Sequence, residues 1–170
     1  MSETKLKIKI FGEPVLRVKA KPVNRITAQH RDILSQMSRA MYDGAGIGLA
    51  APQVGISEQL IVVDIGDGLY KLINPKIVKK TGKQSISEGC LSVPGVCIKV
   101  KRAKQIWIEA KDENNQQIKI QAKDLLACVL QHEIDHLKGK MIIDYASFVD
   151  KLRIKKKLKA LKTKNICQNL

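Results

Sequence analysis

A helix that must be buried constrains the fold of this chain more than any other feature. Residues 124–138 place apolar side chains at helical spacing, at Leu126, Val129, Leu130, Ile134 and Leu137. The same segment contains QHEIDH, in which His132 and His136 lie four residues apart and Glu133 follows the first. Residues i and i+4 share one face of a helix, so both imidazoles can reach one metal ion and Glu133 can reach a group bound to it. Uncompensated histidines and a glutamate would be costly in a core, so the pattern predicts a buried metal site.

The two histidines leave this site one ligand short, and the chain after the helix does not supply it. In the extended zinc-protease motif HExxHxxGxxH, the glycine is matched by Gly139, but Ile142 stands at the last histidine position. No glutamate follows Glu133, which removes the other common metalloprotease ligand. The third ligand is therefore expected upstream.

Four upstream residues are candidates for the third ligand. Cys128 would stretch the ligand set over about 12 Å of helix, too far for one ion, and is better placed as a pocket wall. His30 lies among polar neighbours on an amphipathic helix and is expected to be exposed. Cys97 lies in VCIKV, where alternation predicts a strand residue facing the core. Cys90, in the loop SEGCLSVPG, is free to aim a thiolate at a metal and is favoured.

The remaining elements follow from periodicity and turn residues. We expect a helix over 28–42 that is capped by Thr27, and a last helix that starts near Ser147 with Asp150 at capping-box spacing. Buried or paired strands are expected over 60–65 and 70–78, and Pro75 should bend the second or place it at an edge. A loop is expected over 87–95, and a hairpin formed by 105–111 and 116–122. This order favours an α+β domain over alternating βαβ units.

The glycine-rich segment GAGIGLAAPQVG, residues 44–55, does not predict nucleotide binding. A dinucleotide fingerprint needs a strand before it and a helix after it, whereas here a helix precedes and Pro52 follows. The glycines instead allow the backbone to approach another segment or a ligand closely. Gln53 is a polar residue at the end of an otherwise apolar segment, and its position indicates a specific role.

Charge and cysteine usage bound the partners and the location. The 170 residues, enough for one domain, carry 31 Lys or Arg against 16 Asp or Glu, for a net charge of +15. Eight of those basic residues lie between Lys151 and Lys164, where there is no acid. That segment is either a solvated helix face or a contact with a polyanion such as RNA. Cysteines without a CxxC pair and a start without a signal sequence indicate the reducing cytoplasm, and no apolar run approaches the roughly 20 residues of a membrane span.

Three segments together resemble the signature motifs of bacterial-type peptide deformylases: GIGLAAPQ (46–53), EGCLS (88–92) and QHEIDH (131–136). The resemblance covers about residues 5–150. It implies removal of the formyl group from N-formylmethionyl nascent peptides. It also implies a single α+β domain, with antiparallel β-sheets around the central HExxH helix and a C-terminal helix. Residues 1–150 would form the catalytic part, and 151–170 a basic C-terminal helix or tail of the same domain.

The family's site residues can be carried onto this sequence one by one. The metal would be bound by Cys90, His132 and His136, in agreement with the elimination above. Glu133 would act as general base and then as proton donor, while the Gln53 side chain and the Leu91 backbone N–H would stabilise the oxyanion.

The resemblance also implies a substrate site and a metal. The methionine pocket would be formed by Ile47, Ile86, Leu125, Cys128 and Val129, although each could equally be a plain core residue. The peptide backbone would be bound as an added strand by Ile47, Gly48 and Gly89. One divalent ion is expected per chain, with ferrous iron native and zinc or nickel able to replace it. The sequence does not choose among them.

Two other functions stay open at this point. A metallopeptidase that cuts internal peptide bonds would share the HExxH helix. A protein that binds ribosomes or RNA through its basic tail could use the metal structurally, although no fourth protein ligand is well placed to close such a site. In related bacterial enzymes the C-terminal helix docks on the ribosome, so rRNA is an expected partner. A monomer is expected, and turnover of short peptides should not depend on the tail because no motif residue lies in it.

Overall fold

The computed structural model describes the backbone of residues 5–168 and the side chains of residues 5–163. Residues 1–4 and 169–170, which are the ends of the predicted segments 1–150 and 151–170, lie outside the described residues. The side chain of Lys164, one of the basic residues counted above, also lies outside them. The helices are η1 (Pro14–Arg17), α1 (Ala28–Asp43), η2 (Ala51–Val54), α2 (Asp124–Leu137), η3 (Ile142–Tyr145) and α3 (Phe148–Gln168), where η marks 3₁₀ turns. The strands are β1 (Gly48–Ala50), β2 (Leu60–Val63), β3 (Tyr70–Thr81), β4 (Gln84–Glu88), β5 (Ile98–Arg102), β6 (Gln105–Lys111) and β7 (Gln117–Lys123).

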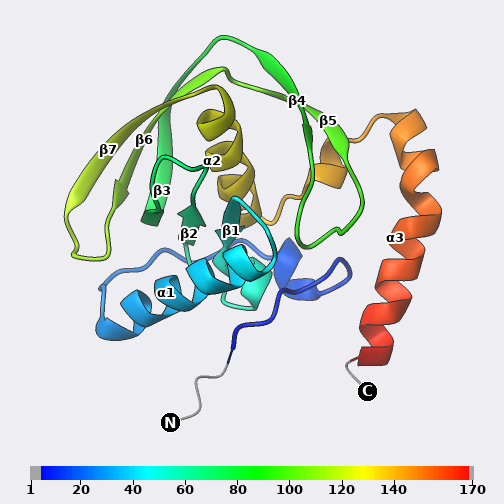
Figure 1. Ribbon diagram of the computed structural model, residues 1–170, viewed down its shortest axis with the longest axis horizontal. Helices are drawn as coiled ribbons and strands as arrows, with labels where there is room; N and C mark the ends of the chain where they lie inside the picture. Colours follow the sequence, from blue (N-terminus) through cyan, green and yellow to red (C-terminus); the bar gives the residue numbers. More distant parts are fainter. Residues whose placement is uncertain (1–4, 169–170) are drawn as a thin grey trace.

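Two antiparallel sheets enclose the helix that carries both histidines. The larger sheet has the order β1-β2-β3-β6-β7, and β4 and β5 form a separate hairpin. Figure 1 shows α2 at the centre, between β3, β6 and β7 on one side and β4–β5 on the other. The predicted α+β domain with antiparallel sheets around this helix is therefore confirmed, and so is the C-terminal helix.

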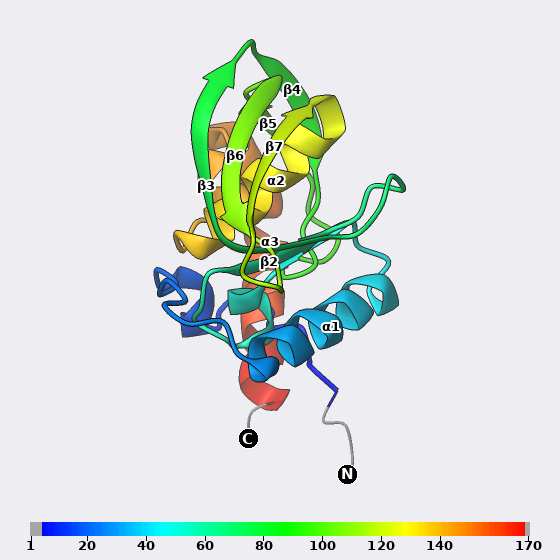
Figure 2. The same ribbon diagram turned by 90° about the vertical axis from the view of Figure 1, so that its left-hand side faces the viewer.

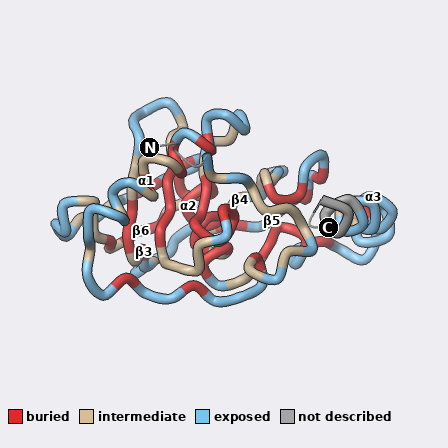
Figure 3. Tube along the Cα trace, turned by 90° about the horizontal axis from the view of Figure 1, so that it is seen from below, coloured by how far each residue is buried: buried red, intermediate tan, exposed pale blue. Residues whose placement is uncertain are grey.

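Three apolar clusters make up the core. The first packs α2 against β6 and β7, through residues such as Leu130 and Ile108, and the second packs α1 against β1 and β2 (Figure 2). The buried residues run through the middle of the molecule in Figure 3, whereas most of α3 is exposed. The third cluster joins the loop after β4 to α3, where Ile154 is buried and Leu158 and Leu161 pack against it. No helix among the described residues is long and apolar enough to cross a bilayer.

Most predicted elements occur within a residue or two of the expected bounds. The strand over 60–65 is shorter than expected and ends at Val63, whereas the strand from Tyr70 is longer and ends at Thr81. Gly139, with φ of +70°, follows the end of α2, and the Ser147 hydroxyl accepts from the Asp150 N–H at 3.1 Å, as the capping box predicts. Pro75 marks a bend, because β3 has a register shift between Ile73 and Lys76.

Three local predictions were wrong. The expected loop over 87–95 begins two residues late, because Ser87 and Glu88 pair with β5 as the end of β4. Cys97 is exposed and precedes β5, in which Ile98 and Val100 face the core, so its predicted phase was off by one residue. His30 is not exposed: its side chain retains 13% of its accessible surface, contacts Thr27 Oγ1 at 2.8 Å and lies 3.4 Å from Glu58.

Candidate functional site

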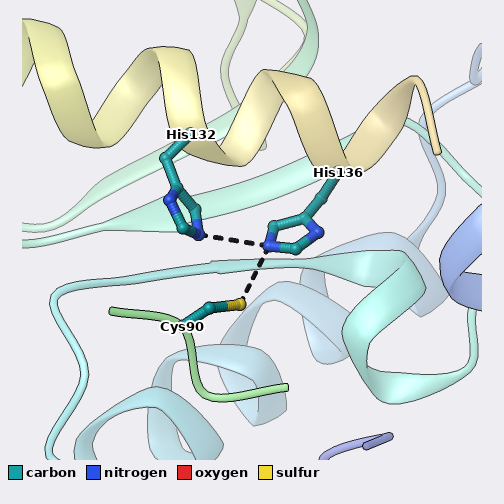
Figure 4. Close-up of side chains that lie close together, drawn as sticks. All are labelled: Cys90, His132 and His136. Atoms are coloured by element: carbon teal, nitrogen blue, oxygen red, sulfur yellow. Dashed lines mark hydrogen bonds between the residues drawn. The ribbon is translucent and has the colours of Figure 1, made fainter. Parts of the chain in front are cut away.

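Three potential metal ligands from two elements converge beside the C-terminal half of α2. His132 and His136 project from consecutive turns of α2, and Cys90 projects toward them from the loop that follows β4 (Figure 4). His132 Nε2 and His136 Nε2 are 3.2 Å apart, and Cys90 Sγ lies 3.3 Å from His136 Nε2. All three donor atoms lie within 4.8 Å of one another, and they form the one such group among the described residues.

This arrangement fits a tetrahedral transition-metal ion. Bonds of about 2.0 to 2.3 Å to nitrogen and sulfur separate the donors of a tetrahedral ion by roughly 3.3 to 3.7 Å, close to the two distances from His136 Nε2 given above. Thiolate and imidazole are ligands for iron, zinc or nickel rather than for magnesium or calcium. Three protein donors leave a fourth position for a reacting group, as in catalytic rather than structural sites.

A chain of buried charged groups fixes the orientation of His132. Its Nδ1 lies 2.9 Å from Glu88 Oε2, which leaves Nε2 facing the other two donors. Arg102 holds Glu88 through two hydrogen bonds, of 2.7 and 2.9 Å, and also binds Asp135. Asp135 in turn accepts from the Tyr145 hydroxyl at 2.7 Å. Such carboxylate–histidine contacts orient a ligand and set its tautomer.

The electrostatics of the site favour a cation at the three donors. Burial lowers the pKa of His136 far below its usual value, and the neighbouring His132 adds to that effect. Burial also lowers the pKa of His132, but hydrogen bonds to Cys90 and Glu88 and the charge of Glu133 outweigh it and raise that pKa to about 10. The groups around His132 thus favour positive charge at this position, and a divalent cation at the three donors would satisfy the same preference.

Glu133 follows His132 on α2 but is held differently from the three donors. Its side chain is buried, and its Oε2 has no hydrogen-bond partner among the described residues. Burial raises the pKa of this carboxyl to about 7, although the nearby His132 opposes the rise. A carboxyl group with a pKa close to the surrounding pH can both accept and return a proton.

In the segment 44–55, Gly44, Gly46 and Gly48 provide space rather than unusual backbone angles, whereas Gly55 adopts a left-handed conformation with φ of +87°. A Cβ on Gly44 or Gly46 would press against the Leu91 side chain, the latter at 2.7 Å. A Cβ on Gly48 would overlap Glu133 Oε1 and lie 2.9 Å from Val129 Cγ1. The glycine segment therefore allows β1 to approach both Glu133 and the loop that carries Cys90.

We expect Gly48→Ala to lower kcat by about 100-fold with the metal retained, because the added methyl group must displace Glu133 and a displacement of about 1 Å can cost that much. Metal analysis and steady-state kinetics would measure both effects. Gly89→Ala is the matched comparison, since nothing lies closer than 3.9 Å to the added Cβ, and a smaller loss is expected there. Equal kcat values for the two variants would contradict the steric role of Gly48.

A cavity of about 520 Å³ opens beside the three donors. Every residue predicted for the substrate site lines it, together with Cys90, His132 and Glu133: Ile47, Gly48, Gln53, Ile86, Gly89, Leu91, Leu125, Cys128 and Val129. Ile47 and Leu125 are each 44% exposed, so they form an apolar rim, whereas Cys128 is buried in the wall. Burial raises the pKa of the Cys128 thiol to about 11, so it stays neutral and behaves as a small apolar side chain.

The groups that support the three donors were not predicted from the sequence. Glu88, Arg102 and Asp135 were not identified as a connected set, and neither was Ser92, whose side chain contacts Gln53. One available signal was strand phase: Ile98, Val100 and Arg102 alternate toward the interior of β5. With that phase, Arg102 is an inward-facing charge that requires buried partners.

Comparisons of the sequence and of the structure with known proteins all lead to one family. A family model described as polypeptide deformylase matches residues 5–152. A peptide deformylase of Syntrophomonas wolfei is 53% identical over 132 residues, which span 78% of this chain and 87% of that protein. The crystal structure of a peptide deformylase from Synechococcus elongatus in complex with actinonin is similar, with a TM-score of 0.86 and 40% identity over 92% of this chain and 90% of that one. A peptide deformylase from Plasmodium falciparum has a TM-score of 0.90 at 33% identity, covering 95% of this chain and 98% of that one.

Proposed function

The chain belongs to the polypeptide deformylase family and removes the N-terminal formyl group from nascent polypeptides, and we propose that Cys90, His132 and His136 hold its metal ion. The family is metal-dependent, and one observation carries the assignment: these three donors meet within 4.8 Å of one another beside Glu133. When bound, the ion would supply a Lewis acid that activates water and polarises the formyl carbonyl.

Glu133 is proposed to move the proton. Water adds to the formyl carbon, the C–N bond breaks, formate leaves, and the free amine must gain a proton. A buried carboxyl with a pKa of about 7 can take the proton from the attacking water and return it to the amine. Its unpartnered Oε2 and its place in the cavity wall support this role.

Gln53 and Leu91 are proposed to stabilise the negative charge that develops on the formyl oxygen. The Gln53 Nε2 lies 3.5 Å from Cys90 Sγ, so the amide is next to the proposed metal site. Leu91 directly follows Cys90, and its backbone N–H is the second proposed donor. Preorganised donors of this kind contribute strongly because they require no rearrangement during the reaction.

The cavity supports binding of a methionine side chain followed by an extended peptide. We propose that Ile86, Leu125, Cys128 and Val129 contact the thioether, and that backbone groups of Ile47, Gly48 and Gly89 bind the peptide as an added strand. The strand β1 is at the edge of its sheet, which leaves one side free for such pairing. Recognition through backbone groups would tolerate varied residues after the methionine.

The substrate preference separates this function from that of an internal metallopeptidase. Three peptides of one sequence would be compared: formylated, acetylated, and unblocked with an internal methionine. Formate release from the first alone is expected. Cleavage of an internal peptide bond at a comparable rate would overturn the proposed site chemistry.

Further aspects are proposed on the same basis. We propose ferrous iron as the native ion, with zinc or nickel as substitutes, a monomer as the working form, and the cytoplasm as the location, because nascent chains emerge there. Residues 151–170 are proposed to belong to the domain of residues 1–150 rather than to form an independent tail. Two contacts support that view: Ile154 packs in the third cluster, and Lys157 Nζ donates a hydrogen bond to Gly95 O.

The exposed face of α3 is proposed to contact ribosomal RNA. Its inward stripe is held by the third cluster, whereas Lys156 and Lys159 are exposed on the other side. Truncation after residue 150 is a poor test because it would also remove Ile154 and the contacts of Lys157 with the loop. Substitution of exposed lysines leaves the packing intact.

We expect Lys156, Lys159 and Lys162 changed together to alanine to weaken binding to purified bacterial ribosomes. A plot of log affinity against log salt concentration has a slope to which each phosphate contact contributes somewhat less than one. Loss of three contacts should therefore reduce the magnitude of this slope by up to about 2 to 3. Turnover of a short formyl-methionyl peptide should be unchanged. The matched control replaces Lys76, Lys80 and Lys123, which are exposed on the distant sheet and carry the same charge (Figure 1). If both triple variants weakened ribosome binding equally, binding would reflect only the overall positive charge of the protein, and the proposed contact of α3 would be wrong.

A further inference from the structure

The Gln53 side chain is held from both ends by groups on two different segments. Its Oε1 accepts from the Ala50 backbone N–H at 2.8 Å, at the start of η2. Its Nε2 donates to Ser92 Oγ at 3.2 Å. Both Gln53 and Ser92 are buried, with 1% and 0% of their surfaces accessible. Because both ends of the planar amide are engaged, the plane has one orientation.

The distance between the two segments is set by a third part of the chain. The Lys9 N–H donates to Gln53 O at 2.7 Å, and the Phe11 N–H donates to Ser92 O at 2.8 Å. The loop is also closed locally, by a hydrogen bond of 3.0 Å from the Val93 N–H to Cys90 O. The backbones that carry Gln53 and Ser92 are therefore tied together by the fold before any substrate binds.

We propose that Ser92 is a positioning residue that aims the Gln53 amide at the formyl oxygen. An amide nitrogen carries two hydrogens. When Ser92 Oγ accepts one of them, the second is directed away from Ser92, and the nitrogen lies 3.5 Å from Cys90 Sγ. Without the hydroxyl, Gln53 keeps the hydrogen bond of Oε1 with Ala50 and the long contact of Nε2 with Cys90 Sγ, and its nitrogen is held less firmly in line. This inference rests on the proposed role of Gln53.

A buried serine could instead serve only to satisfy its own hydrogen bonds. A serine with that purely structural role would change the stability of the fold, or metal content and KM together with kcat. A positioning residue makes a narrower prediction, because its effect on kcat must pass through Gln53. A double-mutant cycle separates these two roles.

The experiment measures kcat, KM, metal content and melting temperature for Ser92→Ala, Gln53→Ala and the double variant, all as metal-loaded enzymes. Loss of one hydrogen bond that orients a catalytic donor is expected to lower kcat by about 10-fold in Ser92→Ala, with KM within about 2-fold. In the Gln53→Ala background the same serine substitution should lower kcat no further. Ser92→Cys, which keeps the branching of serine with a larger atom that accepts hydrogen bonds weakly, should behave like Ser92→Ala and replaces it if the alanine variant does not fold.

Ser85→Ala is the control, since Ser85 is an exposed serine of β4 outside the cavity lining, and it should leave kcat unchanged. An equal fall in kcat from Ser92→Ala in both backgrounds would show that Ser92 acts independently of Gln53 and would overturn the inference alone. A Gln53→Ala variant with unchanged kcat would overturn the proposed oxyanion role of Gln53, and the inference with it.

Discussion

Replacing Cys90 with alanine is expected to remove both the metal and the activity. Cys90 is the one ligand of the proposed set that α2 does not carry, and its thiolate contributes the negative charge of the donor set. Substitutions behind a ligand already cost about 10- to 100-fold in metal affinity, and loss of a ligand itself should cost more. Metal analysis of the purified variant and formate release measure the two effects separately.

Two other cysteines provide matched controls for this experiment. Cys128→Ala should keep its metal, because the thiol of Cys128 is neutral and belongs to the cavity wall. Cys97→Ala should keep both metal and activity, because Cys97 is exposed and lies outside the cavity lining. Full metal occupancy in Cys90→Ala would remove Cys90 from the ligand set.

Replacing Glu133 with alanine or glutamine is expected to give an enzyme that folds and binds metal but releases formate at least about 100-fold more slowly. Neither side chain can take a proton from water and return it to the amine. The glutamine variant is the sharper test, because it keeps the volume that Glu133 fills beside Gly48. The alanine variant instead leaves space in a buried site.

Kinetics and metal analysis on the same preparations distinguish a proton carrier from a ligand. If Glu133→Gln lost its metal, the carboxyl would be part of the ligand set. Near-normal turnover by either variant would remove Glu133 from the mechanism.

The sequence predicted which three donors lie close together because most of their constraints are local. The spacing of His132 and His136 follows from helix geometry, and elimination among a few cysteines and histidines leads to Cys90. The assignment of Cys90 stays a proposal, and two premises of the elimination were wrong, since His30 is partly buried and Cys97 is exposed. Neither belongs to the donor group that the structure brings together.

The partners of the supporting groups could not be predicted because they depend on contacts between distant segments, although the alternation of β5 turns Arg102 inward. Glu88 and Arg102 meet across the β4–β5 hairpin, which was not predicted, and Asp135 joins them from α2. The backbone hydrogen bonds of Lys9 and Phe11 reach segments about 40 and 80 residues away in the sequence, and no periodic pattern in the sequence indicates them. Helices and hairpins follow from near neighbours in the chain, whereas buried polar networks require the tertiary fold.

Metal content and formate release, measured together on one anaerobic preparation, test the central claim most directly. Metal-free enzyme would be titrated with ferrous iron while formate release from a formyl-methionyl peptide is followed. Formate release should rise in proportion to occupancy and reach its maximum at one ion per chain. Full turnover by the metal-free enzyme, or no formate release at full occupancy, would contradict it.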